Sequence, residues 1–146
     1  MWAECYQRKV RGFRGTAALS ALVNDRSTQL GIDFVFYDCG PNIGALNRVV
    51  LLDADYFVVP AACDLFSLRA IKTLGHTLAN WIRDWSTIEA LAPKEFYTFP
   101  GSPKLMGFIP QRFRTYGDLP VDAHVRFISR IATAIHTEVK APELVD

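Results

Sequence analysis

One short segment of the sequence combines a carboxylate with residues that shape a tight loop. Asp38 directly follows the apolar run 34–37, and Gly40 and Pro41 come soon after it. A carboxylate at the end of a buried strand can hold Mg²⁺ directly or through water, because hard cations prefer oxygen ligands. Gly40 lets the backbone approach a phosphate closely, and Pro41 stiffens the turn. The segment predicts a magnesium and phosphate site; a helix cap or a turn is the alternative role for such an aspartate.

Helices and strands are expected to alternate around this segment. Apolar residues at steps of three and four predict helices over 1–29, 43–52, 64–85 and 121–139. Short continuous apolar runs predict strands over 34–37, 56–59 and 105–109, and the proline-rich stretch 92–103 predicts a loop. Such alternation indicates an α/β fold with a parallel sheet between helices. Ligands in such folds bind at the carboxyl ends of the strands, where the Asp38 loop is expected.

Single residues mark where several of these elements begin and end. Gly31 predicts the end of the first helical region, and Gly12 and Gly15 allow a break within it. Asp64 is expected to cap the following long helix by accepting from its exposed N–H groups. Pro120 suits the first turn of the closing helix.

The composition excludes several classes of protein. Half of the residues are hydrophobic and the net charge is +1, so the chain is not disordered, and nothing demands a nucleic acid or an anionic membrane as partner. No apolar run approaches the ~20 residues of a membrane span. The three cysteines have no metal-site spacing, which favours reduced thiols in a cytoplasmic protein. We expect a cytoplasmic protein of one domain without membrane contact.

Two clusters of basic residues leave non-specific DNA binding open. The clusters are Arg8, Lys9, Arg11 and Arg14, and Arg112, Arg114, Arg126 and Arg130. The alternative is that they are the solvated faces of amphipathic helices. The three histidines have no serine or carboxylate at the spacing of a catalytic triad and are interpreted as surface or packing residues.

Several ordered segments resemble the second half of the ParA/MinD-type partition ATPases, P-loop NTPases with a deviant Walker A motif. The matching segments are 38–48 (DCGPNIGALNR), 54–60 (ADYFVVP) and 64–68 (DLFSL). In that family an aspartate, two residues and a proline lead into a short helix, then a strand ending in proline, then a helix opened by Asp-x-x-Ser. The resemblance extends with gaps from about Trp2 to Ile135 and is sharpest over 33–85.

The resemblance implies roles for individual positions. Asp38 would be the Walker B residue at the Mg²⁺ site. The loop that senses the γ-phosphate of ATP would comprise Gly40, Pro41 and Asn42. The residues beside the adenine would be Ile109, Pro110 and Gln111. The family also implies ATP-dependent homodimers, a ParB-type partner and non-specific DNA binding.

The sequence departs from the family at the P-loop. It contains no G-x-x-x-x-G-K-[ST] motif and no Gly-Lys pair, so the phosphates would lack their backbone cradle and main cation. We therefore expect a single truncated domain that does not hydrolyse ATP on its own, with a helical lead-in (1–30), an α/β core (31–139) and a tail (140–146). Its fold would be a partial three-layer α/β/α P-loop NTPase, missing the N-terminal strand and helix. The alternative is an interaction module that docks on an intact ParA-type protein or on DNA.

Overall fold

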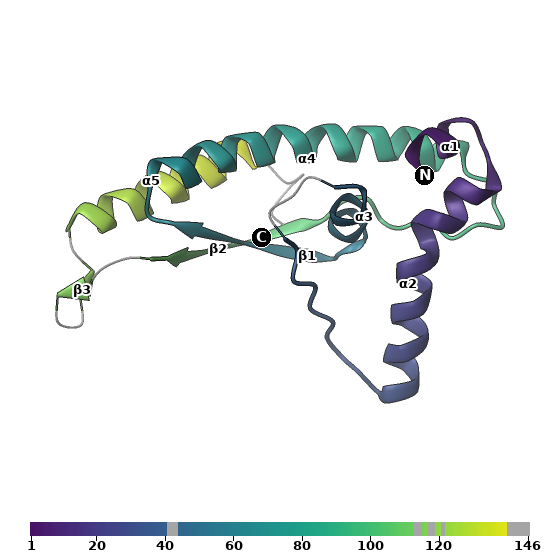
Figure 1. Ribbon diagram of the computed structural model, residues 1–146, viewed down its shortest axis with the longest axis horizontal. Coiled ribbons are helices and arrows are strands. Elements are labelled where there is room, and N and C mark those ends of the chain that lie inside the picture. The colour runs from purple at the N-terminus through teal and green to yellow at the C-terminus, as the bar shows by residue number, and fades with distance from the viewer. Residues whose placement is uncertain (41–43, 113–114, 117–118, 121, 140–146) are drawn as a thin grey trace. The chain divides into compact units, whose positions relative to one another are not determined.

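A computed structural model describes residues 1–40, 44–112, 115–116, 119–120 and 122–139 (Figure 1). It is a mixed α/β structure. Its elements in order are α1 Trp2–Tyr6, α2 Val10–Leu30, α3 Ala45–Asp53, β1 Tyr56–Ala62, α4 Leu65–Leu91, β2 Lys104–Gln111, β3 Thr115–Tyr116, β4 Leu119–Pro120 and α5 Asp122–Glu138. None of the helices in this described part is both long and apolar enough to cross a membrane.

The chain divides into two compact units, which are described separately. The helical unit comprises Met1–Ala54 with Trp81–Ser102, and the sheet unit comprises Asp55–Asn80 with Pro103–Asp146. Helix α4 contributes residues to both.

The sheet unit contains the predicted parallel pair. β1 and β2 run side by side from Tyr56↔Lys104 to Ala62↔Gln111, with an irregularity in the ladder between Phe57 and Val58 (Figure 1). Both strands continue past the proline at which the apolar pattern predicted their ends. A proline can remain in a strand where the partner needs no N–H from it. The expected parallel α/β arrangement is confirmed.

Two contacts explain how the helices of the sheet unit are held. The N–H of Ser67 donates to Asp64 Oδ1 at 2.7 Å, which confirms Asp64 as the cap of α4. At Gly75, a Cβ atom would clash with the Glu138 carbonyl oxygen. Only glycine therefore lets the end of α5 approach α4 this closely. The buried face of α5 is formed by Ile131, Ala134 and Ile135.

The helical unit is built around stacked aromatic rings. Trp85 and Phe99 are each 1% exposed, their ring centroids are 3.7 Å apart, and the Trp85 indole N–H donates to the Phe99 carbonyl at 2.9 Å. The Arg48 guanidinium lies 3.7 Å from the centroid of Trp2 and forms an ion pair with Asp84 at 2.7 Å. Trp85 therefore belongs to the core of the helical unit.

The first helical region has the predicted break, although not at either glycine. α1 ends at Tyr6 and α2 begins at Val10, so Gly12 and Gly15 both lie inside α2. α2 ends at Gly31, whose φ of 63° is the left-handed conformation that glycine adopts without strain.

Two further sequence-based expectations were wrong, and one pair of strands was missed. Residues 34–37 are not a strand: segment 33–40 has no regular structure, and Phe34 and Phe36 are 79% and 92% exposed. The apolar pattern identifies a segment able to pair, but a strand also needs a neighbouring strand. Pro120 lies in the short strand β4 and not in a helical turn, because α5 begins only at Asp122. The antiparallel pairing of β3 with β4 was not predicted.

Candidate functional site

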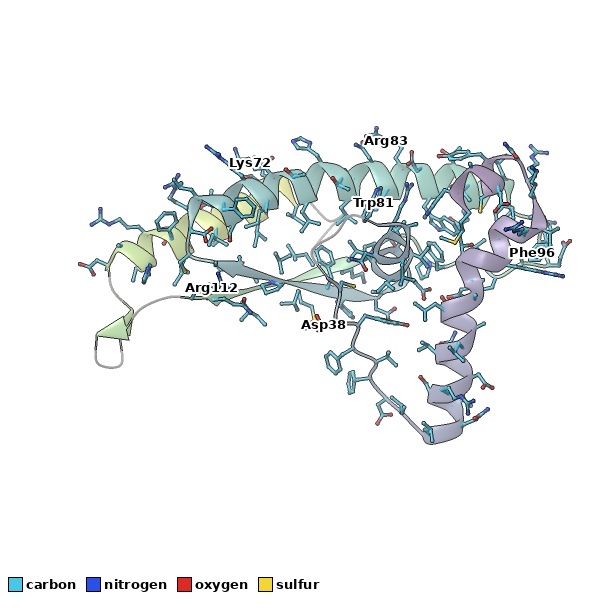
Figure 2. All side chains as sticks on the ribbon, in the orientation of Figure 1. Asp38, Lys72, Trp81, Arg83, Phe96 and Arg112 are labelled. Atoms are coloured by element: carbon cyan, nitrogen blue, oxygen red, sulfur yellow. The ribbon has the colours of Figure 1, made fainter. Side chains whose placement is uncertain are left out.

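Asp38 lies in the extended segment between α2 and α3, and its side chain is exposed (Figure 2). Two residues further on, the carbonyl of Gly40 accepts a 2.8 Å hydrogen bond from the Asn47 side-chain amide. This bond ties the segment to the first turn of α3. Pro41 and Asn42, the rest of the predicted phosphate-sensing loop, lie outside the described residues.

One further carboxylate, that of Asp53, acts on this segment. Burial raises the pKa of Tyr37, and the Asp53 carboxylate raises it further. Both oxygens of Asp53 are engaged, since Ser20 donates to Oδ2 and the Tyr97 hydroxyl donates to Oδ1 at 3.1 Å. Asp53 thus joins α2, α3 and the 92–103 loop, whereas the Asp38 carboxylate faces solvent. The exposed Asp38 carboxylate can serve as an oxygen ligand for a divalent cation. The described residues contain no group of three or more His, Cys, Asp or Glu side chains that could hold a metal ion.

In the sheet unit, polar groups gather at the carboxyl ends of the two parallel strands. The N–H of Cys63 donates to the Gln111 carbonyl at 3.2 Å, which brings the ends of β1 and β2 together. Hydrogen bonds from Ser67 lower the pKa of Asp64, and the charge of Arg112 lowers it further. Ligands of parallel α/β sheets bind at this edge.

The predicted adenine-side residues lie at the same edge. Ile109 and Gln111 are exposed and Pro110 is half-buried. Arg112, which the sequence suggested only as a DNA contact, directly follows β2 with a φ of 53°. Gln111 and Arg112 stand together at the end of a strand, and this sequence pattern could have identified the polar groups at the carboxyl ends of β1 and β2. The Asp38 segment belongs to the helical unit and residues 109–111 to the sheet unit.

The remaining candidate DNA contacts are on α5. Arg126 and Arg130 are exposed there, and the Arg130 guanidinium lies 5.6 Å from the Phe127 ring centroid. Arg114 lies outside the described residues.

An open groove of about 410 Å³ runs between α4 and α5, and Arg130 is among the residues that line it. Lys72 and Arg130 contribute to its lining, but the Lys72 ammonium is 3.6 Å from Glu138 Oε1. The acid partly cancels the lysine charge, so the groove is not a strong anion site.

Comparison with known proteins gives one match. A protein-family model described as an AAA domain matches residues 16–89, just over half of the chain. The matched region contains the Asp38 segment, α3, β1 and most of α4. No curated protein and no solved structure matches the chain.

Proposed function

Because the chain belongs to the AAA-domain family of P-loop NTPases, we propose that it is a cytoplasmic ParA/MinD-type partition protein that does not hydrolyse ATP on its own. The observation that carries this proposal is the Asp38 segment. It combines an exposed carboxylate after an apolar run with a glycine held by Asn47, and it lies within the family match.

The residues present fit some parts of a Mg-ATP site but not others. The oxygen donor Asp38 suits Mg²⁺, and the backbone at Gly40 would face the γ-phosphate. By the family resemblance alone, Ile109, Pro110 and Gln111 of the sheet unit are the residues expected beside the base. The phosphate-binding part of the site is not matched, since the 146 residues contain no Gly-Lys pair to form a cradle. Loss of such electrostatic stabilisation lowers rates by orders of magnitude, which is the basis for expecting no turnover.

The test is calorimetry with Mg-ATP, together with a phosphate-release assay on the 146-residue chain. We expect no phosphate release above the protein-free rate. Any Mg²⁺-dependent nucleotide binding should disappear in Asp38→Ala and persist in Asp25→Ala, a control on the exposed side of α2. Micromolar binding with turnover by the unmodified chain would contradict the proposal.

A second candidate function is a non-catalytic module that docks on DNA or on an intact ParA-type protein. The exposed Arg126 and Arg130 on α5 favour the DNA form of this function. The first proposed function, in partition, includes a ParB-type protein as the partner of this chain. Adding the chain to an intact ParA-type ATPase and measuring the phosphate release of that ATPase tests the docking function on that protein. Both proposed functions leave the chain itself without turnover, and only docking changes the rate of the ATPase.

A further inference from the structure

Residues 30–36 expose a row of large apolar side chains. The exposed fractions are 70% for Leu30, 43% for Ile32, 79% for Phe34, 44% for Val35 and 92% for Phe36. Contiguous apolar surface of this kind marks an interaction site in a soluble protein. The segment is extended and rich in residues that favour strands, yet it pairs with none of the described strands.

The sheet unit has the complementary feature, an open strand edge. β2 pairs with β1 on one side, and no other strand in the described residues pairs with it. Such an edge presents a row of unpaired N–H and C=O groups that can template a further strand. The chain therefore contains both an extended apolar segment that pairs with no described strand and a strand edge that no described strand covers.

Charge distinguishes the two edges of the sheet. Asp33 and Asp38 bracket the apolar run. β2 begins with Lys104 and is followed by Arg112, so its ends attract those two carboxylates. β1 has the opposite character, because the acidic residues Asp55 and Asp64 stand at its two ends. The complementary edge is that of β2.

We propose that two copies of the chain exchange residues 33–38, each adding a parallel strand to the free edge of β2 in the other copy. With Asp33 opposite Lys104, residues 34–38 pair with 105–109. This register stops before Pro110, which cannot donate an N–H to the ladder. The apolar run is continuous, as suits a strand within a parallel sheet. Reciprocal exchange of one element closes a two-fold dimer. The dimer does not depend on the proposed nucleotide site.

The first test is light scattering on the purified chain without nucleotide. We expect a dimer that dissociates into monomers in the double variant Phe34→Asp/Phe36→Asp. Leu22→Asp is the matched control, because Leu22 is also an exposed apolar residue (57%) but lies on α2. Circular dichroism verifies that each variant remains folded. A monomeric wild-type chain, or a dimer that survives the double substitution, overturns the proposal.

The second test shows whether the strand pairs within one chain or between two. Asp33→Lys and Lys104→Asp each place like charges together and should raise the dimer dissociation constant by about tenfold. An equimolar mixture of the two variants restores both opposite-charge pairs and should form a heterodimer with close to wild-type affinity. Pairing within one chain cannot be restored by mixing, so a mixture that remains monomeric overturns the exchange.

Discussion

At the scale of single residues, Arg48 of the helical unit combines two kinds of contact. Its side chain is 17% exposed, and it combines an ion pair to Asp84 with ring contacts to Trp2 and Trp81. The buried Nε atom finds no hydrogen-bond acceptor within the described residues. The guanidinium therefore has a desolvation cost that its ion pair and aromatic neighbours must offset.

Replacing Arg48 with methionine should lower the free energy of unfolding by about 1–2 kcal/mol, because Asp84 loses its partner and Trp2 loses its cation. The half-exposed Asp84 limits the loss, since solvent screens the remaining carboxylate. Arg83→Met is the control: Arg83 is exposed on α4 and is labelled on the opposite side of that helix from Trp81 in Figure 2. Urea unfolding of the two variants gives the comparison, and equal losses would contradict the role of Arg48.

The Asp64 cap makes part of the stability of α4 dependent on pH. Hydrogen bonds from Ser67 and then the Arg112 charge hold the pKa of Asp64 below its ordinary value. A lowered pKa in the folded state contributes stability above the unfolded-state pKa and loses it as the pH falls through the folded value. Asp64→Ala should therefore lower the Tm at pH 7, and the difference from wild type should shrink towards pH ~2. A difference that does not change with pH would mean that charge plays no part in this cap.

At the scale of elements, the same substitution should have opposite signs in two helices. Gly75→Ala forces a Cβ atom against the Glu138 carbonyl and should destabilise the sheet unit by about 1–3 kcal/mol. Gly15→Ala meets only the Met1 side chain, at 3.4 Å, and should stabilise α2 by about 0.5–1 kcal/mol through higher helix propensity. Thermal unfolding of both variants is the measurement. Equal signs would contradict the close approach at Gly75.

Elements with local signals were predictable from the sequence. Asp64 and Gly31 marked helix ends through the chemistry of their own side chain or backbone, and the structure has both. The failure at 34–37 has a different cause: its residue types suit a strand, but pairing depends on a distant neighbour that local sequence does not specify. At the candidate site, the motif predicts a role for Asp38, and the structure shows that its side chain is exposed. The hydrogen bond between Cys63 and Gln111 could not be predicted in this way, because it depends on the register of two strands.

At the scale of the whole molecule, a net charge of +1 leaves only local patches to attract a polyanion. The proposed docking on duplex DNA should weaken steeply from roughly 50 to 200 mM salt, because counterion release supplies most of the free energy. Arg126→Ala with Arg130→Ala should reduce the salt slope by about 1 per contact, whereas Arg83→Ala should leave it unchanged. A fluorescence anisotropy titration measures this. Affinity that does not depend on salt would exclude a phosphate-contact mode.

The thiols give the chain a built-in chemical reporter. Cys5 and Cys63 are buried, so an alkylating reagent should react first at Cys39, which is exposed beside Asp38. Partial desolvation and then the Asp38 charge raise the pKa of Cys39. Asp38→Asn removes that charge and should speed alkylation severalfold, because more of the sulfur becomes thiolate. A cation bound at Asp38 would also speed the alkylation of Cys39, because it neutralises the same charge. Comparing the labelling rates with and without Mg²⁺ therefore measures cation binding at Asp38 without nucleotide or turnover.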